Sequence, residues 1–293
     1  MKDGFAAQIG AVRGAVADAI DLGAVSAGQI STMMSQAFGG SDAGGAWNWR
    51  QAYDLMQSAA LDVLARMAAG QSFEQILAAA QELAARLPTE TRRSERQMQL
   101  QQFSTALPWA VAAAYAGAAH EADTILEPSA GTGSLLRTAT MGARKVRGKV
   151  VPKLHGNEID AFRAAILREA IAAASITTHD AEFIDDLLPA DIAPSLILMN
   201  PPFASSASRS EDPTIALRHA ISAAKRLAIG GRLVAILPPS ASPERQSDLW
   251  RRFGAHVQPV ARLVLPRSAF AKIGTTIETH LLVAEKVIPG VDR

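Results

Sequence analysis

Two patterns of hydrophobic residues divide the chain. In the first third, Leu, Ile, Val, Met and Ala recur at spacings of three and four residues, which is typical of amphipathic helices. This pattern predicts a helical stretch over 5–38, a second helix over 49–69 and a third helix that stops before Pro88. Ser72 and Gln75 match a capping box, so we expect the third helix to begin directly after Ser72.

The remainder of the chain alternates short β-rich runs with Ala- and Leu-rich helical runs. This alternation is typical of a parallel sheet with helices on its faces. The expected strands are 124–127, 153–158, 175–179, 196–199, 232–237, 260–265 and 280–285. The sequence therefore predicts an α/β fold, with a small all-helical region over 1–90 and a seven-stranded, Rossmann-like domain over 91–293.

Composition limits the chemistry that is available. The chain has 293 residues, of which 48% are hydrophobic and 19% charged, so it can bury a sizeable core. It contains no cysteine, which excludes disulfides, thiolate metal sites and a cysteine nucleophile. The net charge is +1 and residues 1–90 alone carry −4, which argues against binding nucleic acid by bulk charge. We find no signal peptide and no bilayer-spanning run, and expect a cytoplasmic protein with neither membrane nor metal among its partners.

A glycine-rich turn follows the first expected strand, in the segment Glu127-Pro128-Ser129-Ala130-Gly131-Thr132-Gly133. Glycines let the backbone approach a ligand that a Cβ atom would exclude. Such a turn, leading into a helix at the carboxyl end of a strand, is where α/β sheets bind nucleotide-like ligands. The segment matches neither the P-loop nor the complete dinucleotide fingerprint. An ordinary tight turn is the alternative.

Acidic residues end the next two expected strands. Glu158, followed by Ile159 and Asp160, ends the second strand, and an acid there can accept both hydroxyls of a ribose. Asp180 ends the third strand and can accept from an adenine amine, with Phe183 packing on the purine. A helix N-cap role for Asp160 and a solvent-exposed charge for Glu158 are the alternatives. Because these residues fall on the same edge as the glycine-rich turn, we expect a nucleoside site there.

The fourth expected strand runs directly into Asn200-Pro201-Pro202-Phe203. The two prolines lack an N–H and stiffen the turn. The side-chain oxygen of Asn200 and the carbonyl of Pro201 can accept the N–H groups of a planar amine while Phe203 stacks on its plane. A rigid structural turn is the alternative. However, the segment follows the fourth strand, at the same edge as the glycine-rich turn, and this position favours an amine site.

These segments resemble amino-methyltransferases that use S-adenosylmethionine. The segment 200–203 matches their Asn/Asp-Pro-Pro-Tyr/Phe motif, and 127–133 matches their cofactor loop. Gln102-Phe103-Ser104-Thr105 and Pro108 resemble the segment that precedes the loop in N6-adenine DNA methyltransferases.

The similarity covers about 95–287. The stretch 230–238 resembles the fifth-strand region of N6-adenine DNA methyltransferases, and 265–286 resembles the ending of type I modification subunits and their relatives. The whole is similar to the methyltransferase segment of strawberry-notch-like phage and plasmid proteins. The helices before residue 90 match no motif.

The resemblance implies a class I methyltransferase sheet, S-adenosylmethionine as cofactor, and direct in-line transfer of a methyl group to N6 of a flipped adenine in DNA. The implied catalytic residues are Asn200, Pro201, Pro202 and Phe203. The implied cofactor-binding residues are Gln102, Phe103, Thr105, Glu127, Pro128, Ala130, Gly131, Gly133, Glu158, Ile159, Asp180, Phe183 and Asn200. The absence of cysteine excludes cytosine C5 methylation, which requires a cysteine nucleophile.

The basic loop Arg144-Lys145-Val146-Arg147-Gly148-Lys149 is the candidate for phosphate contact, together with Arg209. A solvated loop without a ligand is the alternative. Only about 20 residues separate Asp180 from Asn200, too few for a target-recognition domain, and the last expected strand ends near Lys286. We therefore expect DNA recognition to need a separate domain or subunit.

Two other functions stay open. Methyltransferases that act on RNA amines or on a protein glutamine amide also use an Asn-Pro-Pro-aromatic motif, although the Gln-Phe-Ser-Thr segment and the C-terminal pattern favour DNA. A non-catalytic scaffold with this fold is the third possibility, and the intact Gly131, Gly133, Asn200 and Phe203 argue against it.

Overall fold

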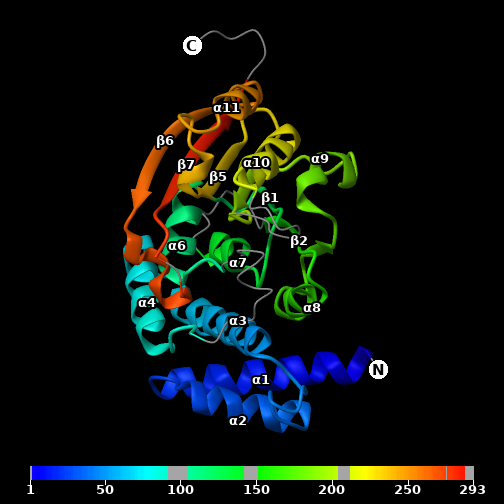
Figure 1. Ribbon diagram of the computed structural model, residues 1–293, viewed down its shortest axis with the longest axis vertical. Helices are drawn as coiled ribbons and strands as arrows, with labels where there is room; N and C mark the ends of the chain where they lie inside the picture. The colour runs from blue at the N-terminus through cyan, green and yellow to red at the C-terminus, as the bar shows by residue number, and fades with distance from the viewer. Residues whose placement is uncertain (1, 92–103, 142–150, 204–211, 275, 288–293) are drawn as a thin grey trace.

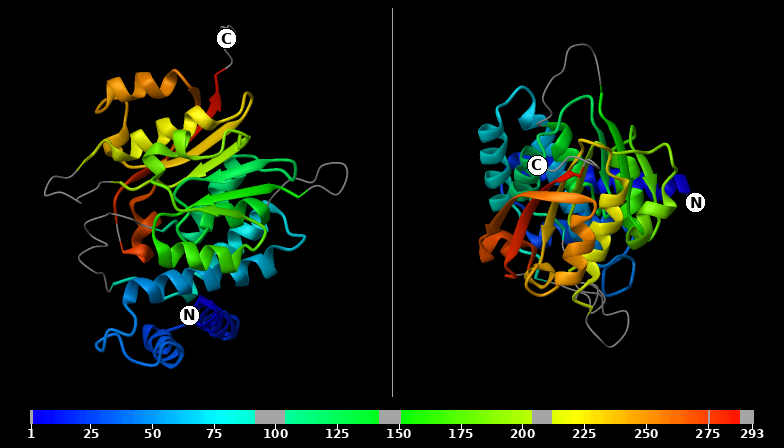
Figure 2. Two further views of the ribbon diagram at one scale, coloured as in Figure 1. Left: turned by 90° about the vertical axis from the view of Figure 1, so that its right-hand side faces the viewer. Right: turned by 90° about the horizontal axis from the view of Figure 1, so that it is seen from above.

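The computed structural model describes residues 2–91, 104–141, 151–203, 212–274 and 276–287 (Figure 1). A seven-stranded sheet lies between layers of helices, and the N-terminal helices form a further layer at one end of the molecule. Helices α1 and α2 lie at one end of the long axis and α11 at the other (Figures 1 and 2). Among the described residues, none of the helices combines the length and apolar character that crossing a bilayer requires.

The N-terminal region consists of amphipathic helices, as predicted, but its first stretch is divided. Gly23 has a φ of +149°, which interrupts the helix, and Ser26 then caps the next one with a complete capping box. The expected capping box of Ser72 and Gln75 is confirmed. The helices are α1 (Lys2–Leu22), α2 (Ala27–Phe38), α3 (Trp49–Ala68) and α4 (Phe73–Arg86).

The sheet contains the seven predicted strands in the order β3-β2-β1-β4-β5-β7-β6. The first five are parallel to one another, and β7 runs antiparallel to both β5 and β6. The carboxyl ends of β1 to β4 therefore meet at one edge. The strands are β1 (Thr124–Glu127), β2 (Lys153–Asn157), β3 (Ser175–Thr177), β4 (Leu196–Met199), β5 (Arg232–Leu237), β6 (Val257–Leu265) and β7 (Thr279–Lys286).

Alternate residues of the central strands face two different cores. Ile197 and Leu233 pack with α10 and α11 on one face, whereas Leu196 and Val234 pack with α6 and α7 on the other. Because both faces are covered, the strands are nearly continuous hydrophobic runs. The remaining helices are α6 (Leu107–Ala116), α7 (Ser134–Met141), α8 (Ala161–Ala170), α9 (Ile184–Leu187), α10 (Ile215–Arg226) and α11 (Ser247–Gly254), with 3₁₀ turns η1 (Ala181–Phe183), η2 (Pro239–Ala241) and η3 (Arg267–Ile273).

The N-terminal helices share a hydrophobic core with the sheet's own helices. Leu107 and Val111 of α6 and Ile166 of α8 belong to the same buried cluster as the apolar faces of α1 to α4. The division into a region 1–90 and a domain 91–293 remains a prediction from sequence, and one cluster of buried side chains joins the two parts.

Candidate active site

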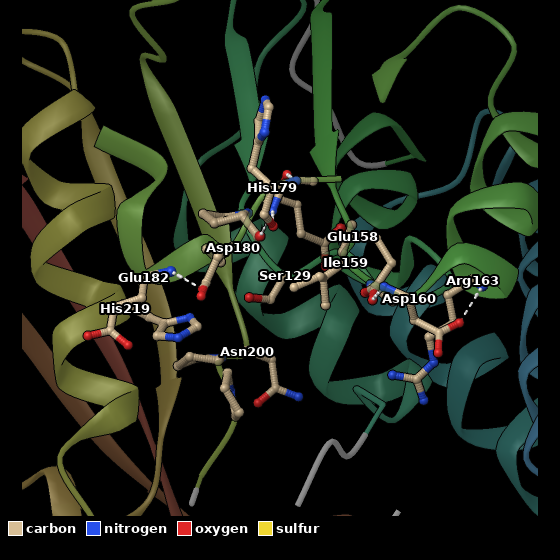
Figure 3. Close-up of a pocket in the computed structure, with 18 of the residues that line it drawn as sticks. Ser129, Glu158, Ile159, Asp160, Arg163, His179, Asp180, Glu182, Asn200 and His219 are labelled. Carbon is tan, nitrogen blue, oxygen red and sulfur yellow. Dashed lines mark hydrogen bonds between the residues drawn. The ribbon is translucent and has the colours of Figure 1, made fainter. Parts of the chain in front are cut away.

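A cavity of about 650 Å³ opens at the carboxyl ends of β1 to β4 (Figure 3). Its walls come from the glycine-rich turn after β1, the acidic ends of β2 and β3, the Asn-Pro-Pro turn after β4 and the first turns of α10. The predicted residues that line it are Thr105, Glu127, Pro128, Ala130, Gly131, Glu158, Ile159, Asp180, Asn200, Pro201 and Pro202. Motifs spread over almost 100 positions thus meet at one edge of the sheet.

The glycine-rich turn requires its glycines for two different reasons. Gly131 has a φ of +55° and open space where a Cβ atom would stand, so its missing side chain leaves room at the cavity. Gly133 has a φ of +84°, and a Cβ atom there would lie 2.6 Å from Cδ1 of Leu167. Gly131 therefore shapes the cavity, whereas Gly133, which does not line it, permits close packing of the turn on α8.

Glu127 ends β1 and is buried between the cavity and α7. Its Oε2 accepts a hydrogen bond of 2.8 Å from the N–H of Leu136, in the first turn of α7. Burial raises the pKa of Glu127 well above its usual range, and the nearby Glu158 raises it further. A buried acid facing the cavity suits a ligand that brings positive charge or hydrogen-bond donors.

Glu158 directly follows the carboxyl end of β2, and its side chain accepts hydrogen bonds from two backbone donors. Its Oε2 accepts from the N–H of Gly131 at 2.7 Å and its Oε1 from the N–H of Asp160 at 2.8 Å. The residue is 5% exposed, so the alternative of a solvent-exposed charge is wrong. Burial raises the pKa of Glu158, while the charge of Arg163 lowers it. The alternative role of Asp160 is confirmed, since it caps α8 by accepting from the N–H groups of Phe162 and Arg163.

The end of β3 provides Asp180 but not the expected aromatic ring. Asp180 lines the cavity and caps the short turn η1 by accepting from the N–H of Glu182. Phe183 is 52% exposed and lies outside the lining, so its predicted packing on a purine is corrected. Phe183 is the last residue of η1, and its side chain is exposed there.

The Asn-Pro-Pro turn faces the cavity, and Asn200 is fixed by a second motif. Nδ2 of Asn200 donates to Oγ1 of Thr105 at 3.1 Å, which makes Oδ1 the acceptor that the amide offers. Phe203 is 3% exposed, packs into the core beside α6 and does not line the cavity. Its predicted stacking on a substrate is corrected, because the ring anchors the turn in the hydrophobic core.

The lining also includes residues that the sequence prediction missed. His219 on α10 is buried, its pKa is lowered by burial to about 4, and its ring lies between Asp180 and Asn200 (Figure 3). Arg50, Thr132 and Arg163 are further examples. The buried face of α10, with Ile215 and His219 one turn apart, was the available signal for His219. No local signal points to Arg50, which comes from the N-terminal helices.

Several predicted residues lie outside the described part of the chain. They are Gln102, Phe103, Arg144, Lys145, Arg147, Lys149 and Arg209. Arg137, in α7, interacts with α3: its side chain donates to the carbonyl of Ser58 at 3.1 Å and forms an ion pair with Asp62. Over the residues that the structure describes, no group of three or more His, Cys, Asp and Glu could hold a metal ion.

No protein-family model matches the sequence, and the comparison with curated proteins finds no match. Solved structures match at low sequence identity. A candidate class I S-adenosylmethionine-dependent methyltransferase from Listeria monocytogenes is 14% identical, covers 77% of this chain and 72% of its own, and has a TM-score of 0.55. The modification subunit of a candidate type I restriction enzyme from Vibrio vulnificus is 16% identical, covers 76% of this chain and 54% of its own, and has a TM-score of 0.51. A candidate RNA methyltransferase from Pyrococcus horikoshii is 16% identical and has a TM-score of 0.50. The match covers 75% of this chain and 98% of the Pyrococcus chain.

These similarities define the fold. The chain has the seven-stranded α/β architecture of class I methyltransferases, preceded by helices, as the sequence predicted. It spans about half the length of the Vibrio modification subunit.

Proposed function

We propose that the protein is an S-adenosylmethionine-dependent methyltransferase that acts on an exocyclic amine, N6 of adenine in DNA. The observation that carries this proposal is the meeting of the glycine-rich turn and the Asn-Pro-Pro turn on one cavity. A cofactor site and an acceptor site that share one cavity can bring a methyl donor and an amine into contact.

The residues present fit the cofactor. The cavity volume of about 650 Å³ lies in the range of cofactor sites. Oγ1 of Thr132 and Nδ1 of His219 are buried and have no hydrogen-bond partner within the described ranges. Buried polar atoms normally have a partner, so these two atoms indicate that a polar ligand completes the site.

Each part of the cofactor has residues suited to it. Glu158 would accept from the ribose hydroxyls and Asp180 from the adenine amine. Thr105, Glu127 and the backbone at Gly131 would hold the methionine end. When bound, S-adenosylmethionine supplies an electrophilic methyl group on a positively charged sulfur.

The protein's own contribution to the transfer is to hold the acceptor amine. Oδ1 of Asn200 and the carbonyl of Pro201 would accept its two N–H groups, which increases electron density on the nitrogen and directs its lone pair toward the methyl donor. Thr105 keeps the amide of Asn200 in the required orientation. This route needs no covalent intermediate on the protein, in agreement with a chain that lacks cysteine.

DNA is favoured over other amine substrates by the sequence. The Gln-Phe-Ser-Thr segment precedes the cofactor turn as it does in N6-adenine DNA methyltransferases. The basic loop 144–149 and Arg209 are proposed to contact phosphates, and a separate domain or subunit is proposed to recognise the target sequence.

Transfer of labelled methyl groups tests the proposal. The protein is incubated with labelled S-adenosylmethionine and separate pools of DNA, RNA and protein, and DNA is digested to nucleosides. We expect label in N6-methyl-2′-deoxyadenosine from DNA. Label in RNA or in glutamine would overturn the DNA assignment while leaving the methyltransferase, and cofactor binding without transfer to any pool would point to the non-catalytic scaffold.

A further inference from the structure

Helix α3 contributes a residue to the cavity. Of the lining residues that the structure describes, Arg50 is the one that comes from the four N-terminal helices. It lies in the first turn of α3, and Asp54 follows one turn later on the same face. Both side chains are turned inward, with exposed fractions of 13% and 4%. The N-terminal helices therefore reach the site, although they match no methyltransferase motif.

Arg50 reaches Glu158 through one intermediate residue. Nη2 of Arg50 lies 3.3 Å from Oδ2 of Asp160. The backbone N–H of Asp160 donates to Oε1 of Glu158, the proposed ribose acceptor. Because the other oxygen of Asp160 caps α8, the ion pair with Arg50 fixes the carboxylate of Asp160 from a second side.

Asp54 reaches Glu158 through a different residue. Nε of Arg163 donates to both carboxylate oxygens of Asp54 at 3.0 and 3.1 Å, and both residues are buried. Buried charges of this kind keep a fixed geometry, because separating them would leave each one unpaired. The positive charge of Arg163 in turn lowers the pKa of Glu158. Helix α3 thus holds both groups that flank Glu158.

We propose that Arg50 and Asp54 are positioning residues for the cofactor, through which the N-terminal helices keep Glu158 directed at the ribose. This inference rests on the proposed function. An ionised carboxylate can accept two hydroxyl donors, whereas a protonated one must donate at one oxygen. A change at Arg50 should therefore alter cofactor affinity through its effect on Glu158.

The charges around Glu158 determine how this would depend on pH. Asp160 after β2 is negative and favours the protonated form of Glu158, whereas Glu127 at the end of β1 has its own pKa raised by burial and by the charge of Glu158. Arg163 and Arg50 are positive and favour the ionised form of Glu158. The negative charge of Asp54 partly offsets the positive charge of both arginines. Removal of the Arg50 charge should raise the pKa of Glu158. The loss of cofactor affinity should then be larger at pH 6 than at pH 8.

Arg50→Gln and Arg13→Gln form a matched pair of variants. Both arginines have a side-chain exposure of 13%, and Arg13 also joins the N-terminal helices to α8, because it pairs with Asp62 of α3 and with Glu169 of α8. Arg13 does not line the cavity. Calorimetry measures the binding of S-adenosylhomocysteine and of 5′-methylthioadenosine, which keeps the ribose and adenine but lacks the amino acid portion. Thermal unfolding of each variant reports whether it is folded.

Arg50→Gln should lower the affinity for both ligands by about tenfold at pH 6 and by less at pH 8. Arg13→Gln should bind both ligands as the wild type does, and Arg50→Lys should restore the wild-type pH profile because it keeps the charge. Absence of binding by the wild type would refute the proposed function itself. With the wild type binding, three results would overturn the inference alone: equal affinity of Arg50→Gln, a loss confined to S-adenosylhomocysteine, or an equal loss in Arg13→Gln.

Discussion

Thr105 Oγ1 accepts a hydrogen bond of 3.1 Å from Nδ2 of Asn200, a residue 95 positions later in the chain. Both residues are buried and both line the cavity. The bond joins the segment that precedes the cofactor turn to the turn that would hold the acceptor amine. It sets the orientation of the amide on which the proposed chemistry depends.

Thr105→Val should lower the rate of methyl transfer by about tenfold, because the Asn200 amide would lose the bond that orients it. If Thr105 acts through Asn200, Thr105→Val should lower the turnover number little further in a protein that already carries Asn200→Ala. The measurement is a double-mutant cycle on the turnover number. Additive losses in the double variant would show that the two residues contribute independently.

Gly131→Ala and Gly133→Ala should separate binding from folding. Gly133→Ala places a Cβ atom 2.6 Å from Leu167 at a φ of +84°, and we expect a loss of about 2–4 kcal/mol in the free energy of unfolding. Gly131→Ala has room for the atom and should cost only about 1 kcal/mol, but it should weaken cofactor binding because the atom enters the cavity. Denaturant unfolding and calorimetry measure the two effects. Normal cofactor affinity of folded Gly131→Ala would contradict the site.

His219 should make the protein less stable in mild acid. Its pKa is about 4 in the folded state, because of burial, against 6.5 when exposed. Between these values the unfolded state binds a proton and the folded state does not, so stability is lost as the pH falls from 6.5 to 4, by up to about 3 kcal/mol. His219→Gln should remove this part of the pH dependence, measured as the free energy of unfolding against pH. An imidazole that titrates near 6.5 in the folded protein by NMR would refute the prediction.

The basic loop should govern what affinity the isolated chain has for duplex DNA. Replacement of Arg144, Lys145 and Arg147 by Ala should flatten the dependence of binding on salt, by about 0.9 in the log–log slope for each phosphate that the variant no longer neutralises. Cofactor binding should stay unchanged, which serves as the control. Tight, sequence-specific binding by this chain alone would contradict the expectation of a separate recognition domain.

The strands and the outline of the site could be predicted from the sequence because their signals are local. The alternation of hydrophobic runs predicted all seven strands, and the carboxyl ends of parallel strands necessarily meet at one edge. Glu158, Asp180 and Asn200 each closely follow a strand, so they reach the same cavity.

The directions of aromatic side chains and the contribution of α3 could not be predicted in this way. Phe203 stands beside the Asn-Pro-Pro turn in sequence, yet the core next to α6 buries its ring. Arg50 is separated from the cavity residues in sequence and reaches them only because α3 packs on α7 and α8. Such placements depend on tertiary packing, which neither periodicity nor motif spacing reports.

Asn200→Ala, compared with the wild type, tests the central claim most directly. Calorimetry measures S-adenosylhomocysteine binding and a labelled-methyl assay on DNA measures transfer, both with the same preparations. We predict cofactor affinity close to that of the wild type and a rate of transfer lower by about 100-fold or more, because a positioned acceptor would be removed from the amine. Transfer by Asn200→Ala at a rate near that of the wild type would show that the Asn-Pro-Pro turn is structural, and would contradict the proposed mechanism.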